Sequence, residues 1–444
     1  MQEVSTPQVD DVIRIQDDNN RKDGKIESEH KKPAVCILTA GKGSRLGELS
    51  SHVNKALIPI NNKAAISYII DMTPNDYDVV IAVGYKGDQV IDYCSHMHPE
   101  RNFQFVRIEN YDPNLTGPGT SLYACKEFLQ RPFIFAASDI IIENDSIGTC
   151  DSNWLSTCET ALSEIYATVK ISGDSIESIV DKSPQGFKHA WTGLMSIYDY
   201  EEFWKNYEAS EREIPNVIKK CLSSMSFSAK NIPWYDLGTY DSYISAKKHF
   251  ENNSQYTIPK RNFELFFRRG DRVCKYHPDS NHVENLTKRA KSFSTQNIVP
   301  NYDNDKNSLV CYEWNPGKDL YEIDNFDVYK NALETLSDVL WNKYIKTEDS
   351  LKVSKKFYKD LSIKRIEDFI NADKNRKALL EGIKINNNQL QIFDKEIGDA
   401  FDYEGLFECV QVKDYHGDFH FSNIIFDSST EKYSVVDIRP DFYN

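Results

Sequence analysis

Short apolar runs alternate with amphipathic stretches along the first half of the chain. A helix is predicted over residues 65–71, between the first two apolar runs. The runs themselves predict strands, and they are residues 34–40, 79–85, 103–108 and 132–142. Strands that alternate with helices are typical of a parallel βαβ sheet. The pattern therefore predicts an α/β domain.

The pattern changes further along this half. Residues 165–198 favour antiparallel or mixed strands, and residues 241–252 predict a closing helix. The segment after that helix is polar and contains a proline, which is typical of a linker. We therefore place a domain boundary near Ser254, with a first domain over residues 33–253 and a linker over residues 254–260.

The second half of the chain has a different order of elements. Residues 262–278 predict a β-hairpin that turns at Arg269-Gly270-Asp271, and a helix follows from about Ser280. Residues 327–401 are predicted to be mostly helical. No internal repeat is visible, so we expect a second, different fold over residues 261–444.

Composition and charge narrow the range of functions. The net charge of −15 argues against a general nucleic-acid binder, because Lys and Arg side chains hold phosphate backbones. Nine Cys are scattered without a C-x-x-C pair, so neither a zinc site nor a disulfide framework is indicated, and a reducing compartment fits best.

The N-terminal segment and the apolar runs bear on location. Residues 1–32 are polar and rich in charge, and we expect a disordered tail without a signal peptide. No apolar run reaches the roughly 18 residues that a membrane span requires. The sequence therefore predicts a cytoplasmic protein without a membrane span.

A glycine-rich turn follows the first predicted strand. Gly41 and Gly43 would let backbone N–H groups approach phosphate oxygens, and Arg45 and Lys55 would neutralise their charge. The P-loop and dinucleotide-binding patterns both fail, since Leu46 stands where the latter needs its third glycine. The turn is therefore a candidate triphosphate cradle, and a purely structural glycine turn is the alternative.

With the segments 38–46 and 54–60, this stretch resembles the sugar-1-phosphate nucleotidyltransferase family, which includes the phosphocholine cytidylyltransferases. The resemblance covers about residues 33–252, and it implies a Rossmann-like domain and Mg²⁺ as cofactor. The residues that it implies for nucleotide binding are Ala40, Gly41, Gly43, Ser44, Gly117, Gly119 and Thr120, beside Arg45 and Lys55 as catalytic residues. Asp139 and Asp236 are implied as metal ligands, and Lys182 and Gly193 as substrate-binding residues.

The implied chemistry is attack of a phosphomonoester oxygen on the α-phosphorus of an NTP, with release of pyrophosphate. Two anions must come together, so charge neutralisation is the main catalytic task. Each site residue also has a plain structural alternative: Asp139 as a helix N-cap, Asp236 as a turn residue and Lys182 as an exposed charge, since Ser183 interrupts its motif.

A second motif lies near the end of the chain. His416, Asp418 and Asn423 have the H-x-D-x-x-x-x-N spacing of kinases, and Asp437 ends the next apolar strand. An H-x-D-x-H metal site that includes His420 is the alternative. The block resembles the aminoglycoside phosphotransferase and choline kinase families. This resemblance implies an α+β protein-kinase-like phosphotransferase domain, with Asp418 as catalytic base and Asn423 and Asp437 as metal ligands.

Upstream segments are candidates for the smaller lobe of such a domain. Lys275 resembles the strand lysine that binds the α- and β-phosphates, Glu284 is its candidate partner, and residues 309–314 resemble the strand before the adenine hinge. The sequence ends at Asn444, soon after Asp437, and we expect a trimmed or truncated larger lobe.

The two resemblances together predict a bifunctional enzyme. A kinase half would phosphorylate a small alcohol, amino alcohol or sugar with ATP, and the transferase half would couple the product to CTP, UTP or dTTP for surface glycan or lipid synthesis. Transferase activity alone, with the second half as a binding or regulatory module, is one alternative. A scaffolding protein without catalysis is another. The base, the acceptor and the oligomeric state stay open.

Overall fold

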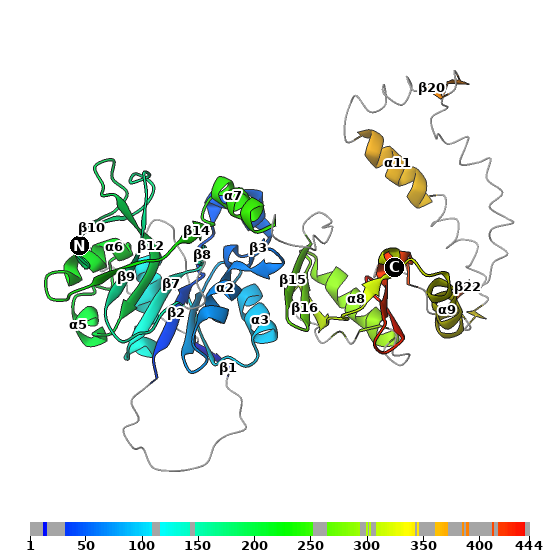
Figure 1. Cartoon of the computed structure of the whole chain (residues 1–444), viewed down its shortest axis with the longest axis horizontal. Helices are drawn as coiled ribbons and strands as arrows, with labels where there is room; N and C mark the ends of the chain where they lie inside the picture. The colour runs from blue at the N-terminus through cyan, green and yellow to red at the C-terminus, as the bar shows by residue number, and fades with distance from the viewer. Residues whose placement is uncertain are drawn as a thin grey trace, which may run out of the picture. The chain divides into compact units, whose positions relative to one another are not determined.

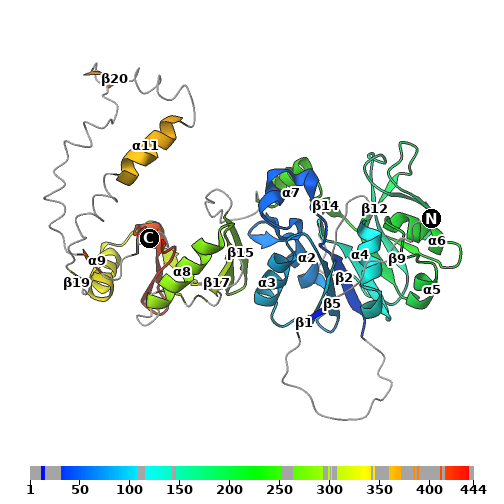
Figure 2. The ribbon, with the colours of Figure 1, turned by 180° about the vertical axis from the view of Figure 1, so that it is seen from behind.

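A computed structural model of the chain divides into two compact units (Figures 1 and 2). The first contains Met1–Lys288 and Asn301–Trp314, and the second contains Arg289–Pro300 and Asn315–Asn444. The structure describes residues 12–15, 32–108, 116–142, 147–251, 264–293, 299–300, 302, 308–341, 344–345, 360–371, 384–385, 388–389, 411–412 and 416–439. We describe each unit by itself.

The first unit is built on a ten-stranded sheet with the order β1-β6-β5-β2-β7-β12-β10-β11-β13-β9. Its parallel strands are β2 (Ala34–Leu38), β5 (Asp78–Val83), β6 (Phe103–Arg107) and β7 (Phe133–Ala137). All four come from the predicted apolar runs, and their side chains are buried almost throughout because both faces are covered. The predicted α/β domain is therefore confirmed.

Helices cover the two faces of this sheet. The helices α2 (Ala65–Met72) and α3 (Gly87–Met97) share one apolar core with the odd-numbered side chains of β2. The helices α4 (Pro118–Ala124), α5 (Tyr200–Lys205) and α6 (Ile214–Cys221) share a second core with the even-numbered ones. The result is a three-layer arrangement.

Antiparallel strands extend the sheet beyond β7. As predicted for residues 165–198, this region forms β10 (Thr168–Ser172), β11 (Ser175–Val180) and β12 (His189–Ile197). Two further strands, β9 (Trp154–Glu159) and β13 (Ser228–Asn231), were not predicted and pair in parallel at the far end.

A small second sheet brings two distant segments together. The strand β8 (Ile140–Ile142) pairs antiparallel with β14 (Trp234–Asp236), and Asp236 lies opposite Ile140. The predicted closing helix follows as α7 (Tyr240–Glu251). Short elements surround the glycine-rich turn: η1 (Ser44–Leu46), α1 (Glu48–His52), η2 (Lys55–Leu57), β3 (Pro59–Ile60) and β4 (Lys63–Ala64).

The predicted hairpin forms β15 (Leu265–Arg269) and β16 (Arg272–Tyr276), with β17 (Leu309–Glu313) as third strand and α8 (Ser280–Phe293) after it. Cys274 and Cys311 are cross-strand partners and form a disulfide. Our expectation of no disulfide was wrong. The two cysteines are 37 positions apart in the sequence, and only the strand pairing brings them together.

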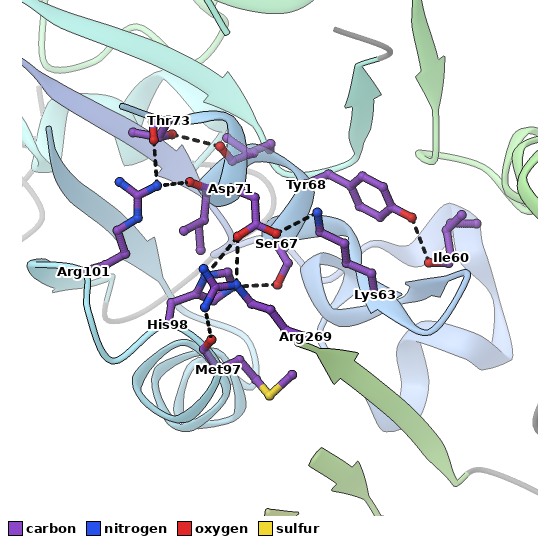
Figure 3. Close-up of polar contacts among 12 residues, drawn as sticks. Ile60, Lys63, Ser67, Tyr68, Asp71, Thr73, Met97, His98, Arg101 and Arg269 are labelled. Carbon is purple, nitrogen blue, oxygen red and sulfur yellow. Dashed lines mark hydrogen bonds and ion pairs between the residues drawn. The ribbon is translucent and has the colours of Figure 1, made fainter. Parts of the chain in front are cut away.

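This three-stranded sheet shares an apolar core with α2 and α3. Figure 3 shows the polar contacts of its Arg269 with Asp71. The rings of Phe267 and Tyr93 are 4.9 Å apart, edge to face. Arg269 donates from Nε to Asp71 Oδ1 at 2.9 Å and from Nη2 to Glu100 Oε1 at 2.6 Å. Asp71 also pairs with Lys63 at 2.7 Å. The predicted linker 254–260 lies outside the described residues, and our domain limits stay predictions.

The second unit has a smaller sheet of β18 (Lys318–Asp319), β23 (Ile424–Asp427) and β24 (Lys432–Val435). Residues 327–401 were predicted to be mostly helical. Their described part contains α9 (Phe326–Leu336), the π-helix η6 (Ser337–Trp341) and α11 (Leu361–Asn371), but also the short strands β19 (Tyr344–Ile345), β20 (Lys384–Ile385) and β21 (Asn388–Gln389). The remaining short elements are η5 (Leu320–Glu322), β22 (Gln411–Val412) and η8 (Phe421–Asn423).

The N-terminal segment contains one further strand. Val12–Ile15 form β1, which pairs antiparallel with β6, so the predicted disordered tail is wrong for these four residues. Three of the four are β-branched apolar residues, which favour a strand. The run is short and lies in a highly charged segment, so we did not recognise it as a strand. Among the described residues, no helix is long and apolar enough to cross a membrane.

Candidate active site

The glycine-rich turn lies at the carboxyl end of β2. Gly43 has a φ of +64°, a conformation that favours glycine, and it precedes η1, which begins at Ser44. Ala40 is buried, whereas no atom lies within 4 Å of the position that a Cβ on Gly41 would take. The backbone at Gly41 therefore has open space beside it, as a phosphate cradle needs.

Asn54, which we had not assigned a role, holds this turn in place. It is fully buried, and its Oδ1 accepts a hydrogen bond from Ala56 N at 2.9 Å. Its Nδ2 donates to Thr39 O at 2.9 Å and to Tyr85 O at 2.6 Å. One amide thus joins the end of β2, the loop after β5 and η2, which begins at Lys55. Its position beside Lys55 in the sequence was the available signal.

Lys55, Asp139, Asp236 and Arg45 converge around Gly238. Lys55 Nζ lies 3.1 Å from Asp139 Oδ2. A Cβ on Gly238 would stand 2.9 Å from Asp236 Oδ1, 3.3 Å from Asp139 Oδ2 and 3.5 Å from Arg45 Nη2. The pairing of β8 with β14 explains this arrangement, because it places the two aspartates at the same end of adjacent strands.

The two carboxylates are in unequal environments. Burial would raise the pKa of Asp139, but the ammonium of Lys55 and the guanidinium of Arg45 keep that pKa below its usual value. Burial and the nearby charge of Asp139 raise the pKa of Asp236. Asp236 also accepts hydrogen bonds from Gly238 N at 2.9 Å and from Tyr166 OH at 3.3 Å. A cation between the two carboxylates would relieve their repulsion.

The residues fit the Mg²⁺ that the resemblance implies. Mg²⁺ binds carboxylate oxygens, usually through one or two carboxylates plus the phosphates of a substrate. Asp139 and Asp236 provide such a pair, and Lys55 and Arg45 lie beside them for the phosphates. Asp139 and Asp236 therefore form a candidate metal site at the mouth of the glycine-rich turn.

The loop predicted to bind the base packs tightly against another loop. Gly119 N donates to Arg212 O at 2.7 Å, and a Cβ on Gly117 would stand 2.5 Å from the same oxygen. Thr120 Oγ1 accepts from Gly117 N at 2.8 Å. The two glycines are therefore needed for close backbone packing, and their role with a nucleotide stays a prediction.

The two predicted substrate-binding residues lie in different settings. Lys182 is exposed, has a φ of +43°, and its charge offsets part of the rise in pKa that burial causes at Glu213. Gly193 has a φ of +84° at an irregularity of β12, and a Cβ there would stand 3.0 Å from Ala137 Cβ. Gly193 thus lies beside the end of β7, close to Asp139.

A pocket of about 300 Å³ opens beside Asp236. Aromatic and acidic side chains line it. The rings of Tyr166 and Trp234 meet edge to face with centroids 5.1 Å apart, and Glu159 adds a carboxylate. Trp234 lies two residues before the predicted ligand Asp236, whereas Tyr166 and Glu159 come from segments without a recognisable pattern.

In the second unit, the kinase-like motif forms one cluster. Asn423 Nδ2 donates to Asp418 O at 2.8 Å, and Val436 N donates to Asn423 O at 3.0 Å. Asp418 Oδ2 accepts from Arg439 Nη2 at 3.1 Å. Asp437 has a φ of +62°, a strained conformation of the kind found at functional sites. The strands β23 and β24 thus bring Asp418, Asn423 and Asp437 together.

His416 is a buried residue that contacts the backbone of this cluster. It is 3% exposed, and its Nε2 lies 2.7 Å from Val436 O. Burial lowers the pKa of His416 to about 4, so the ring is neutral at pH 7. His420 contacts Asn423 and Ser422.

Lys275 and Glu284 belong to the first unit. Lys275 lies on β16 with its Nζ 5.9 Å from the ring centre of Phe266 and 5.8 Å from that of Tyr312. Glu284 pairs with Lys288 one helical turn further along α8, at 2.5 Å. Their predicted roles with ATP stay predictions.

Comparison with known proteins decides the identity of the N-terminal part. Residues 35–149 match the family described as the MobA-like NTP transferase domain. This part of the chain is similar to MobA-like NTP transferase domains, and we call it the NTP transferase domain. The match contains the glycine-rich turn, Lys55 and Asp139.

Relatives of the NTP transferase domain include two kinds of enzyme. The chain is 24% identical over 235 residues to the bifunctional protein GlmU of Methanococcus vannielii, covering 49% of this chain and 55% of the relative. It is 30% identical over 115 residues to the choline-phosphate cytidylyltransferase of Streptococcus pneumoniae, covering 25% of this chain and 46% of the relative. The chain spans about half the length of the curated relatives it matches.

Solved structures similar to the chain also cover the NTP transferase domain. One is the CTP:phosphocholine cytidylyltransferase from Streptococcus pneumoniae, with a TM-score of 0.42 at 18% identity, covering 49% of this chain and 99% of that chain. Another is the inositol-1-phosphate CTP transferase from T. maritima, with a TM-score of 0.40 at 13% identity, covering 51% and 99%.

Proposed function

We propose that the first unit is a nucleotidyltransferase that couples an NTP to a phosphomonoester and releases pyrophosphate. The observation that carries the proposal is the convergence of Lys55, Arg45, Asp139 and Asp236 beside the glycine-rich turn. A phosphomonoester oxygen forms a bond to the α-phosphorus, and the bond from that phosphorus to the oxygen that bridges the α- and β-phosphates breaks.

The proposed roles follow from charge. Mg²⁺ held by Asp139 and Asp236 supplies electrostatic stabilisation of the phosphates. Lys55 and Arg45 neutralise charge that builds up as the two anions approach each other. Asn54 orients η2 and therefore Lys55. No residue of the chain becomes covalently attached to substrate in this scheme.

The pocket beside Asp236 suggests the acceptor. Aromatic faces together with carboxylates suit a cation, and a quaternary ammonium above all. We therefore propose an amino-alcohol phosphate such as phosphocholine as acceptor, in line with the 30% identity to a choline-phosphate cytidylyltransferase. CTP, UTP and dTTP are the nucleotides to compare.

The test measures pyrophosphate release by the full chain with Mg²⁺, each of these NTPs, and phosphocholine, phosphoethanolamine, glucose 1-phosphate or N-acetylglucosamine 1-phosphate. The variants Lys55→Ala, Asp139→Asn and Asp236→Asn are expected to lose on the order of 100-fold or more in turnover. The exposed Glu177→Gln is a matched control that should keep full activity. Unchanged release in the three variants, or no release by the unaltered chain with any pair, would contradict the proposal.

The acceptor class has its own test. Glu159→Gln removes one carboxylate from the pocket, so KM for phosphocholine should rise while KM for glucose 1-phosphate stays the same. Equal effects on both acceptors would argue against a cation-binding pocket.

A second candidate activity rests on the cluster of Asp418, Asn423 and Asp437. We propose that this unit transfers the γ-phosphoryl group of ATP to a small alcohol, with Asp418 as base and the other two as Mg²⁺ ligands. The product would be the phosphomonoester that the transferase consumes.

Two variants separate the activities. Asp418→Asn should abolish ATP-dependent phosphorylation of choline and leave pyrophosphate release unchanged, and Asp139→Asn should do the reverse. Phosphorylation that persists in Asp418→Asn would contradict the proposed kinase activity. The transferase would then be the one activity still proposed, with the second half as a binding module.

A further inference from the structure

Three potential metal ligands meet at one end of the three-stranded sheet, in a part of the first unit that the proposed transferase does not use. Glu264 directly precedes β15, and His277 directly follows β16. Leu265 is the partner of Tyr276 in the antiparallel register, so Glu264 and His277 lie opposite each other at the end of the hairpin.

His282 joins them from the first turn of α8. Its ring stacks on that of His277, with centroids 3.8 Å apart and planes only 12° from parallel. One ligand atom from each of Glu264, His277 and His282 lies within 4.8 Å of the others. All three side chains are partly exposed, so an ion from solvent can reach them.

The backbone helps to hold this arrangement. His277 Nδ1 lies 3.1 Å from Asp279 N and 3.3 Å from Asp279 O, which fixes the orientation of the ring. The short connection from β16 to α8 then places His282 over it. A ligand histidine regularly donates its second ring N–H to a carbonyl oxygen in metal sites, and the contact of His277 Nδ1 with Asp279 O provides such a partner.

The ligand types indicate the ion. Two imidazoles and a carboxylate suit a first-row transition metal, whereas Mg²⁺ and Ca²⁺ prefer oxygen ligands alone. Two His and one Glu with a position left for water also occur in zinc sites. We propose that Glu264, His277 and His282 bind a divalent transition-metal ion, with Zn²⁺ as the best-suited ion.

A bound ion would connect the start of β15, the end of β16 and the first turn of α8. Because the ion binds the folded arrangement and not the unfolded chain, it raises the stability of this sheet. The site therefore has a measurable effect that is separate from catalysis.

The test uses the full chain with Asp139→Asn and Asp236→Asn, so that the transferase carboxylates do not compete for the ion. After treatment with EDTA, Zn²⁺ is titrated in the presence of excess Mg²⁺ and followed by calorimetry, and Co²⁺ is used for visible absorption. We expect one equivalent of Zn²⁺ to bind and to raise the unfolding temperature. His277→Gln, His282→Gln and Glu264→Gln each remove a ligand and should each weaken binding by more than the roughly 10- to 100-fold that loss of an outer-shell partner causes.

His96→Gln is the matched control, because His96 is a partly exposed histidine of α3 outside the cluster. It should bind Zn²⁺ like its parent. Far-UV circular dichroism establishes whether each variant is folded. If a histidine variant does not fold, the binding measurement is made with Glu264→Gln in its place. Zn²⁺ binding that is unchanged in His277→Gln/His282→Gln, or no Zn²⁺ binding by the parent, would overturn the proposal.

Discussion

Asn54 connects three loops through a single buried side chain. Its amide donates to the carbonyl oxygens of Thr39 and Tyr85 and accepts from the backbone at Ala56. Since the next residue is Lys55, any shift of this amide also shifts the ammonium that pairs with Asp139. The proposed transfer reaction would therefore depend on a residue that acts by holding Lys55 in place.

Asn54→Ala should reduce both stability and turnover. The change leaves two buried carbonyl groups without their donor, which costs about 2 kcal/mol in the free energy of unfolding. Turnover should fall roughly tenfold because Lys55 is less well oriented. Urea denaturation and pyrophosphate release measure the two effects.

Asn102→Ala is the control for that variant. Its amide bonds Asp78 at the surface, so we expect a change within about 0.5 kcal/mol and full activity. Equal losses in the two variants would contradict a special role for Asn54.

At the scale of elements, the hairpin β15–β16 is anchored by a cluster of acidic and basic residues from β4, α2 and the segment that follows α3. Asp71 contacts Lys63 and Arg269, and His98 Nδ1 lies 3.5 Å from Asp71 Oδ1 (Figure 3). His98 is fully buried, and its Nε2 lies 2.8 Å from Ser67 Oγ. A neutral histidine is therefore enclosed among charged groups.

This cluster makes stability depend on pH. Burial and the nearby charge of Arg269 lower the pKa of His98 to about 4, against opposing effects of Asp71 and Glu100. The unfolded chain takes up a proton near pH 6.5 and the folded chain does not, so stability is lost as pH falls from about 6.5 to 4. The loss due to His98 should reach roughly 1 kcal/mol per pH unit.

His98→Gln should flatten this dependence. The free energy of unfolding is measured by urea denaturation at about pH 7.5, 6 and 5. This spacing of roughly one pH unit resolves the change of stability with pH. His416 has a similar shift in the second unit, so the contribution of His98 is the difference between the two proteins. Identical slopes would show that His98 is protonated equally in both states.

Most of the elements near the site could be predicted, since their signals are local. The apolar runs of β2, β5, β6 and β7 are continuous, and the glycine-rich turn, Lys55 and Asp139 lie in short motifs. Features made by residues far apart in sequence could not be predicted. The pairing of β9 with β13 and the disulfide between Cys274 and Cys311 depend on contacts that leave no periodic pattern.

The candidate sites show the same division. Asp139 and Asp236 were predicted from their motifs, although only the pairing of β8 with β14 brings them together. Tyr166, Glu159 and the cluster of Glu264, His277 and His282 were missed. None of these residues lies in a local sequence motif, and each was recognised as a candidate only because the fold places it beside residues that are distant in sequence.

At the scale of the whole molecule, the two candidate activities belong to separate compact units. The transferase residues lie in the first unit, and Asp418, Asn423 and Asp437 lie in the second. Each cluster is completed by hydrogen bonds and ion pairs within its own unit. We therefore expect a substitution in one cluster to leave the folding of the other unaffected.

The four-residue strand β1 has a consequence for solubility. It covers the outer edge of β6, a five-residue strand in which three of the side chains are large and apolar. An uncovered, apolar edge strand offers free N–H and C=O groups to another molecule. Deletion of residues 1–20 should cause association that increases with concentration, whereas deletion of residues 1–8 should not, as light scattering would show. A segment that contributes nothing to the chemistry would thus protect the protein from aggregation.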